Sequence, residues 1–162
     1  MRFTGILAVC GLVAGCAQPP ADTEAAPLSR SEGRPAELVE PNTRDVNCMA
    51  EAIYFEARGT GAEGTRAVGH VIQNRAESDE FPDTVCAVID DKCQFSYRCD
   101  GVPEELSHDE ARARALKTAQ QVLSGAPDIT NGALFFHSAG IEPGWFSTRK
   151  RVGKFGGNIF YR

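Results

Sequence analysis

Apolar side chains recur with a helical spacing over two neighbouring segments. The first runs from about residue 46 to 58, where Asp45 is placed to cap a helix and Gly59 to end it. The second runs from 62 to 76, with apolar residues at positions 67, 68, 71 and 72. The pattern therefore predicts two amphipathic helices joined by a short turn.

Two further segments have helical signals of their own. Residues 107–110 (S-H-D-E) have the form of a capping box and precede an alanine-rich helix that extends to Ser124 and is closed by Gly125. Residues 85–89 suit a short helix capped by Asp83 or Thr84, although V-C-A-V-I suits a buried strand equally well. The chain is therefore expected to be mainly helical.

The pattern changes after Pro127. Short strands are predicted for residues 133–136 and 158–161, among glycine-rich loops. With the helices, these strands predict a single mainly helical α+β domain over residues 44–162.

The first 15 residues have the pattern of a cleavable export signal. Arg2 is followed by an apolar stretch over 3–13, which is shorter than the roughly 20 residues that span a bilayer. Residues 12–16 (L-V-A-G-C) resemble the lipobox of bacterial lipoproteins, so Cys16 is expected to carry the lipid. Ala17 in the next position suggests the outer membrane. The alternative is an ordinary signal with an incidental cysteine.

Residues 16–43 are predicted to be a disordered tether that holds the domain away from the membrane. They hold five of the nine prolines of the chain and show no apolar period. We therefore expect a lipid-anchored protein on the periplasmic face of the cell envelope.

Charge is unevenly distributed along the chain. The net charge is -5, which argues against a nucleic-acid partner. Acidic residues dominate positions 77–110, whereas the C-terminal part carries a basic run: Arg149, Lys150, Arg151 and Lys154. Such runs are usually solvated faces; the functional alternative for the basic run is contact with an anionic polymer.

Four cysteines lie in the predicted domain, and two disulfide bonds are expected because the chain carries an export signal. The close pair Cys93 and Cys99 would close a small loop and leave Cys48 to join Cys86. Four cysteines allow three pairings, and the sequence does not decide among them. A zinc site of four thiolates is the alternative, but the usual C-x2-C spacing is absent.

The histidines and the absent motifs narrow the chemistry. His70 is expected to be structural, His108 exposed, and His137 placed at the end of a strand where it can enter a cleft. The chain contains no H-E-x-x-H, no G-x-S-x-G and no glycine-rich phosphate loop between a strand and a helix. We therefore expect acid–base chemistry without a metal or another cofactor.

Glu56 is the leading acid–base candidate. It follows Tyr54 and Phe55 near the C-terminal end of the first predicted helix, where the helix dipole and apolar neighbours raise the pKa of a carboxyl. Arg58 opposes that rise if it turns inward. Glu51 lies about 140° away around the helix, so a carboxylate pair is not expected. The alternative is an exposed glutamate at a helix end.

Several blocks of sequence resemble one family. A-E-A-I-Y-F-E-A-R-G at 50–59 and A-V-G-H-V-I-Q-N-R at 67–75 are similar to the opening of the SleB/CwlJ-type cell wall hydrolases. The similarity continues in the same order through residues 81–86, 93–101, 132–137 and 160–162. The combination of these blocks is highly specific.

The resemblance implies a lysozyme-like domain that degrades peptidoglycan glycan strands, with Glu56 as the general acid. Relatives act as lytic transglycosylases on the bond between N-acetylmuramic acid and N-acetylglucosamine. One carboxyl suffices for that reaction, since Glu56 first gives a proton to the leaving oxygen and then assists the attack of the muramic acid 6-hydroxyl. Gln94, Ser96, His137 and Tyr161 are expected to line the cleft.

Two departures from the family pattern bear on the cleft. The loop of residues 90–92 is short, and Asn158 stands where many relatives place a histidine. Trp145 is a further candidate for stacking on a sugar. An N-acetylmuramoyl-L-alanine amidase and a non-catalytic peptidoglycan-binding lipoprotein are the alternative functions, and a monomer is expected in each case.

Overall fold

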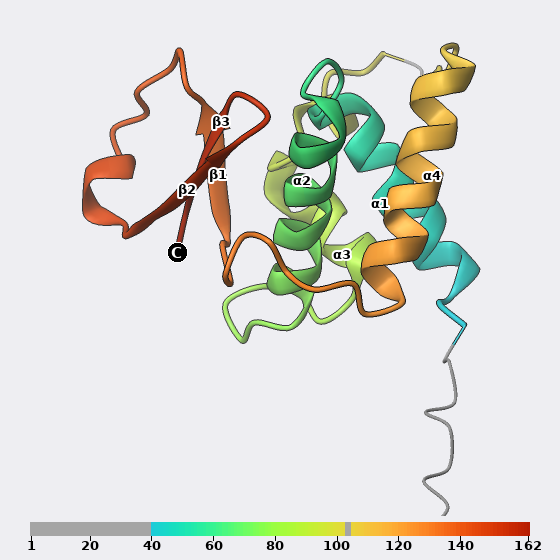
Figure 1. The fold of residues 1–162 in the computed structure, drawn as a ribbon, viewed down its shortest axis with the longest axis horizontal. Helices are drawn as coiled ribbons and strands as arrows, with labels where there is room; N and C mark the ends of the chain where they lie inside the picture. The colour runs from blue at the N-terminus through green and yellow to red at the C-terminus, as the bar shows by residue number, and fades with distance from the viewer. Residues whose placement is uncertain (1–39, 103–104) are drawn as a thin grey trace, which may run out of the picture. The chain divides into compact units, whose positions relative to one another are not determined.

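The computed structural model describes residues 40–102 and 105–162. The predictions for the export signal, for Cys16 and for most of the tether lie outside these residues. In the described ranges, the chain forms four α-helices and a three-stranded antiparallel sheet (Figure 1). The expected mainly helical α+β fold is therefore confirmed. No helix in these two ranges combines the length and the apolar character that crossing a bilayer requires.

The first three helices are α1 (Thr43–Glu56), α2 (Gly61–Ala76) and α3 (Val85–Asp90). The prediction of Asp45 as the cap of α1 is wrong, because the side chain of Asn42 accepts a hydrogen bond from the Arg44 N–H at 2.9 Å. Asp45 instead lies in the first turn, where its charge interacts favourably with the helix dipole. Of the two alternatives for residues 85–89, the structure forms the helix, with Thr84 as its cap.

The fourth helix, α4 (Asp109–Leu123), begins without the predicted capping box. His108 is its N-cap residue and no side chain caps the helix there. The Ser107 hydroxyl is hydrogen-bonded to Tyr54 of α1, which also accepts a bond from the His108 N–H at 3.3 Å. A tertiary contact between α1 and α4 therefore replaces the expected local cap.

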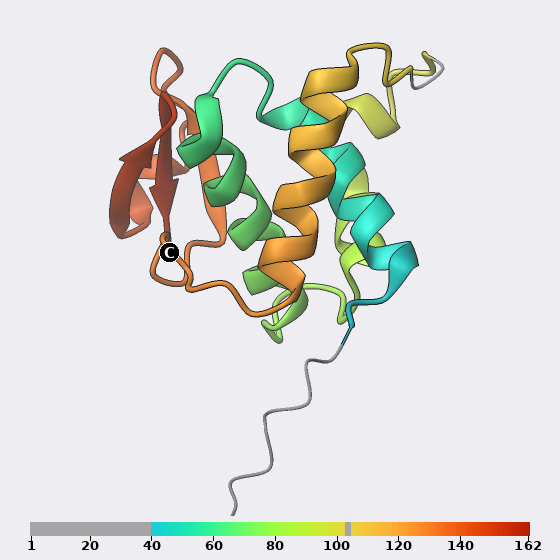
Figure 2. The same cartoon turned by 45° about the vertical axis from the view of Figure 1, so that its right-hand side comes forward.

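The helical core forms where α4 packs against both α1 and α2 (Figure 2). Gly69 of α2 lies at this meeting point. A Cβ there would lie 3.2 Å from side-chain atoms of Ile53 in α1 and Val122 in α4. Glycine at this position therefore lets the three helices approach one another closely.

The sheet follows α4 in the chain and has the order β1-β3-β2. Its strands are β1 (Phe135–Ser138), β2 (Arg151–Phe155) and β3 (Asn158–Tyr161). Strand β3 is where the sequence predicts it, whereas β1 begins two residues later than expected. The sequence pattern did not predict β2, since its exposed basic residues interrupt any apolar alternation.

One face of the sheet packs towards the helical core. Phe160 is fully buried in that core, and Phe136 and Phe155 contact its ring from the neighbouring strands. The turn between β2 and β3 reaches the start of α2, where a Cβ on Gly156 would come within 2.5 Å of the Gly64 Cα. Close packing of two glycines therefore joins the sheet to α2.

Two disulfide bonds connect the four cysteines of the domain. Cys48 of α1 is joined to Cys86 of α3, and Cys93 to Cys99 across a short loop. Of the three pairings that the sequence allows, this is the one that the structure contains.

Asp128 organises the segment that leads into β1, so its removal is expected to destabilise the fold. Its carboxylate accepts hydrogen bonds from the N–H groups of Thr130 and Gly132, each at 2.7 Å, and one from Asn74 of α2 at 3.2 Å. We expect Asp128→Ala to lower the free energy of unfolding by about 1–3 kcal/mol, because donors are left without their acceptor. Urea unfolding at neutral pH measures the change, with exposed Asp79→Ala as the control.

The effect of Asp128→Ala should depend on pH. Burial raises the pKa of Asp128, but the hydrogen bonds to its carboxylate outweigh burial and lower the pKa overall. The stabilisation is therefore complete above the pKa of the unfolded carboxyl and is lost as the pH falls through the folded value. If the difference in free energy of unfolding between the native chain and Asp128→Ala grew towards acid pH, the ionised Asp128 carboxylate would not be the stabilising form.

Candidate active site

Glu56 is the last residue of α1, and its side chain is half-buried. Burial raises the pKa of this carboxyl, and the positive charge of Arg75 opposes the rise without cancelling it. The direction is the one expected from the sequence. Glu56 therefore retains its proton to a higher pH than an exposed glutamate does.

Arg75 of α2 is the charged neighbour that the sequence analysis missed. It is 6% exposed, and its Nε donates a hydrogen bond to the Leu134 carbonyl at 2.8 Å. The guanidinium carbon lies 5.0 Å, 5.7 Å and 5.9 Å from the ring centres of Phe81, Phe95 and Phe135. Burial lowers the pKa of Arg75 to about 10, so the side chain is charged at neutral pH.

One signal in the sequence does point to a buried Arg75. Position 75 continues the stripe of positions 68, 71 and 72 along α2, all of which are buried. An arginine on the apolar face of a helix needs acceptors and aromatic partners inside the fold. Here those partners come from three separate segments: the turn after α2, the loop after α3, and β1.

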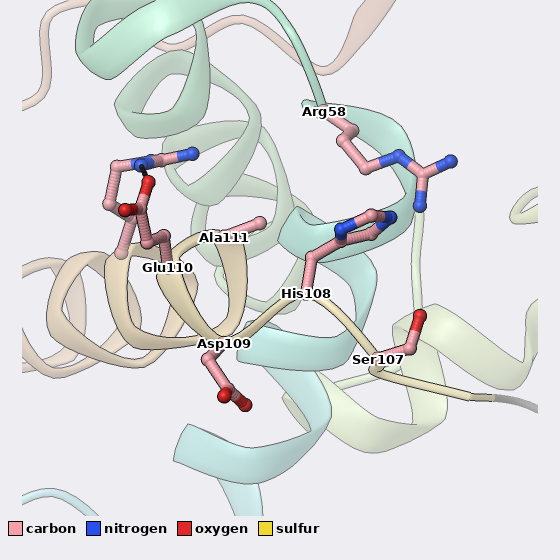
Figure 3. Close-up of a pocket in the computed structure, with 7 residues that line it drawn as sticks. Arg58, Ser107, His108, Asp109, Glu110 and Ala111 are labelled. Atoms are coloured by element: carbon pink, nitrogen blue, oxygen red, sulfur yellow. Dashed lines mark ion pairs between the residues drawn. The ribbon is translucent and has the colours of Figure 1, made fainter.

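Arg58 does not oppose the pKa rise of Glu56 as the sequence analysis considered. Its guanidinium lies over the Tyr54 ring, 5.7 Å from the ring centre. Figure 3 shows Arg58 facing Ser107 and His108 across a pocket of about 540 Å³ at the start of α4. Burial raises the pKa of Tyr54, but hydrogen bonds with His108, Arg58 and Ser107 lower it overall. Arg58 thus belongs to the contact between α1 and α4.

The loop closed by the Cys93–Cys99 disulfide packs against the C-terminal end of α1. Phe95 and Tyr97 are buried, and the Tyr97 ring stacks on Phe55, with ring centres 4.5 Å apart. Because Phe55 immediately precedes Glu56, the loop lies against the end of α1. Two of the predicted cleft residues, Gln94 and Ser96, alternate with the buried rings and are exposed on this loop.

The other two predicted cleft residues lie together on the sheet. His137 Nε2 is 3.0 Å from the Tyr161 hydroxyl, and the two rings are stacked with centres 5.3 Å apart. Trp145 and Phe146 pack edge-on against both rings. This cluster occupies the sheet face opposite to the one that carries Phe160.

The remaining residues discussed from the sequence have clear positions. Glu51 is paired with Arg98, with Oε1 and Nη1 3.1 Å apart, which agrees with the expectation that it does not pair with Glu56. Asn158 is buried and lies on the Phe160 side of the sheet, opposite Ser138 and Phe155. His70 is buried, with its Nδ1 3.8 Å from Asp128 Oδ1, in agreement with a structural role.

Comparison with known proteins establishes the family. A profile of the family described as Cell Wall Hydrolase matches residues 59–161. The chain belongs to this cell wall hydrolase family. The matched range begins three residues after Glu56, so the assignment to the family is independent of that carboxyl.

Similar curated proteins are described as spore cortex-lytic enzymes. The spore cortex-lytic enzyme of Oceanobacillus iheyensis is 36% identical over 116 residues, which is 72% of this chain and 41% of that protein. This cell wall hydrolase chain therefore spans about two fifths of the length of that curated relative.

Two solved structures share the fold. The catalytic domain of SleB, a germination-specific lytic transglycosylase from Bacillus anthracis, gives a TM-score of 0.65 at 34% identity, covering 75% of this chain and 96% of that domain. The catalytic domain of Bacillus cereus SleB gives a TM-score of 0.62 at 30% identity, covering 81% and 99%. The described part of the chain thus corresponds to nearly a whole catalytic domain of this family.

Proposed function

We propose that the chain cleaves peptidoglycan glycan strands as a lytic transglycosylase, with Glu56 as its acid–base group. The observation that carries the proposal is the half-buried Glu56 carboxyl with a raised pKa, at the end of α1 in a SleB-like domain. The likeness to a domain named as a lytic transglycosylase supports this reaction over other ways of degrading the wall.

The reaction requires one carboxyl that acts twice. Protonated Glu56 donates its proton to the glycosidic oxygen as the bond from that oxygen to muramic acid C1 breaks. The resulting carboxylate then accepts the proton of the muramic acid 6-hydroxyl as O6 bonds to C1. The product is a 1,6-anhydro sugar, and Glu56 is again protonated without the consumption of water.

Arg75 has a defined part in this cycle. Its positive charge acts on Glu56 from a site of low exposure, where charges interact more strongly than in water. It therefore stabilises the carboxylate that exists between the two proton transfers. Burial favours the protonated starting form, so the two influences act on the Glu56 pKa in opposite directions, with burial the larger.

Four polar or aromatic residues are proposed to bind the sugars. Gln94 and Ser96 expose their side chains on the loop beside α1. His137 and Tyr161 form a hydrogen-bonded pair on the sheet, in which Tyr161 is buried and His137 is partly exposed. Trp145 lies beside them as a half-exposed stacking surface. The two groups suit successive sugars of one strand.

Product analysis tests the proposed reaction directly. Purified sacculi are digested with the native chain, and the soluble products are identified by mass spectrometry. Anhydro-muropeptides are expected. Ordinary reducing ends would indicate a muramidase, free stem peptides would indicate the amidase alternative, and binding without any product would favour the non-catalytic lipoprotein.

We also propose export and lipid anchoring, with signal cleavage after residue 15 and acylation of Cys16. The support is the L-V-A-G-C sequence at 12–16, followed by Ala17, which suggests the outer membrane of a two-membrane cell. Two acyl chains anchor a protein stably, and the segment to residue 43 would then act as a tether for a monomeric enzyme. Incorporation of labelled palmitate that is abolished by Cys16→Ala tests the anchor.

The pH at which the rate of cleavage declines is expected to be higher in Arg75→Gln than in the native chain. Activity requires protonated Glu56, so kcat/KM decreases as the pH rises through the Glu56 pKa. Arg75 lowers that pKa, and the neutral glutamine removes this influence. The profile of kcat/KM against pH measures the shift.

A matched variant separates charge from structure. Arg75→Lys keeps the positive charge and should keep the descending limb near its native position, even if the loss of the hydrogen bond to Leu134 lowers stability. Two results would contradict the role of the Arg75 charge. The descending limb of kcat/KM could move to lower pH in Arg75→Gln, or it could move by the same amount in both variants. Far-ultraviolet circular dichroism confirms that both variants are folded.

A further inference from the structure

The last part of the chain is strongly basic although the whole chain is acidic. No aspartate or glutamate occurs in residues 143–162, while the net charge of the protein is -5. The same segment contains Arg149, Lys150, Arg151, Lys154 and Arg162. The proposed acid–base chemistry uses none of these residues, so the concentration of charge requires another explanation.

Strand pairing places two of these cations on one face of the sheet. In the antiparallel ladders, Phe135, Tyr161 and Arg151 lie opposite one another across β1, β3 and β2. His137, Ile159 and Lys154 form the next such row. Cross-strand partners project to the same face. We call this the outer sheet face, and it is formed by Phe135, His137, Trp145, Arg149, Arg151, Lys154 and Tyr161.

Aromatic rings and cations are interleaved on the outer sheet face. The Arg149 guanidinium carbon lies 3.4 Å from the centre of the Phe135 ring. Trp145 is 37% exposed and packs edge-on against His137 and Tyr161, with ring centres 5.7 Å away in each case. The face therefore offers a fixed aromatic surface with positive charge along its edge.

Within the part of the chain that the structure describes, the cations of the basic run form no ion pair with a carboxylate. In residues 40–102 and 105–162, arginines 98 and 114 form ion pairs with acidic side chains, but no member of the run does. Lys150, Arg151 and Lys154 are exposed. These three charges are thus available to an external anion.

We propose that the outer sheet face binds the carboxylates of the peptide stems that peptidoglycan carries, separately from the glycan bond that Glu56 cleaves. The identity of the polymer rests on the proposed function. Stem carboxylates fit the charge, and the fixed Trp145 ring offers a stacking surface for an adjoining sugar. An anionic bilayer fits less well, because Trp145 is packed against three rings and only partly exposed.

Phe135 connects the outer sheet face to the surroundings of Glu56. Its ring lies under Arg149 on one side and 5.9 Å from the guanidinium carbon of Arg75 on the other. Arg75 in turn acts on Glu56 electrostatically. A substrate held by its stems on the outer sheet face is therefore close to the segments that surround the catalytic carboxyl.

Binding to sacculi by a catalytically inactive chain tests the proposal. The full chain with Glu56→Gln is compared with the same chain carrying Arg149→Gln, Arg151→Gln and Lys154→Gln, by co-sedimentation at low salt. We expect the three substitutions to weaken binding about tenfold, as three exposed ion pairs of modest strength would. The matched control replaces Arg66, Arg112 and Lys117, which changes the net charge equally and should leave binding unchanged.

Two further substrates identify the ligand. On glycan strands from which an amidase has removed the stems, the two chains should bind equally. Equal binding to intact sacculi, or a difference that persists on stripped strands, would overturn the proposal. The same two chains are also tested on vesicles. If the three substitutions weaken binding tenfold to vesicles that contain phosphatidylglycerol, but not to phosphatidylcholine vesicles or to sacculi, the face would be assigned to the membrane instead. Since binding is measured without cleavage, these outcomes are independent of whether the native chain makes anhydro sugars.

Discussion

Replacing Glu56 with glutamine is expected to slow glycan cleavage by about 10²–10⁴-fold, the usual contribution of a general acid. Glutamine has nearly the same shape but has no acidic proton to give to the glycosidic oxygen. It also cannot accept the proton of the 6-hydroxyl in the second step. The initial rate at which labelled sacculi release soluble muropeptides measures the loss.

Glu51→Gln is the matched control for Glu56→Gln. Glu51 lies on the same helix, is also partly exposed, and pairs with Arg98 near the surface. Loss of such a pair costs about 1 kcal/mol of stability or less, and the rate of cleavage should remain near the native value. Similar rates in Glu56→Gln and the native chain would remove Glu56 from the mechanism.

The helices could be predicted from the sequence because their signals are local. The period of apolar residues over 62–76 and 107–124 gives α2 and α4 almost to their ends. The first turn of α4 is the exception. Its predicted capping box does not form because Tyr54, more than 50 residues earlier, takes the hydrogen bonds of Ser107 and His108.

Strand β2 could not be predicted from the sequence because its stability depends on pairing. Its residues alternate poorly, and the register with β3 shifts between Arg151 and Gly153. What the sequence does contain is the pair of glycines after the strand, both with positive φ, which form the turn to β3. Without β2, the sequence predicts the basic run only as a solvated face or a contact for an anionic polymer, and its placement across from Tyr161 could not be foreseen.

The candidate site could be predicted only where its signals are local. The position of Glu56 at a helix end follows from the local pattern, and the exposure of Gln94 and Ser96 follows from their alternation with buried rings. The influence of Arg75 on Glu56 depends on how α2 packs against α1, which no local pattern contains. The alternation of β1 puts Phe135 and His137 on one face, but only the fold shows which face packs on the helices.

The two disulfide bonds are expected to differ in how much their removal destabilises the fold. Replacing Cys48 and Cys86 with serine opens a link between residues 38 apart, for which the chain-entropy relation gives a loss of about 4 kcal/mol. Replacing Cys93 and Cys99 opens a link of only 6 residues, for which the same relation gives about 2 kcal/mol. Urea unfolding of both double variants measures the difference.

The effects on activity should be in the reverse order. The Cys93–Cys99 link constrains the loop that exposes Gln94 and Ser96, whereas Cys48 and Cys86 join α1 and α3 away from that loop. Under conditions in which both variants are folded, we expect the loss of Cys93–Cys99 to raise KM for glycan strands several-fold and the loss of Cys48–Cys86 to leave it nearly unchanged. A variant without Cys93–Cys99 that keeps the native KM would show that this loop does not hold the sugars, and would move the substrate-binding role to the sheet.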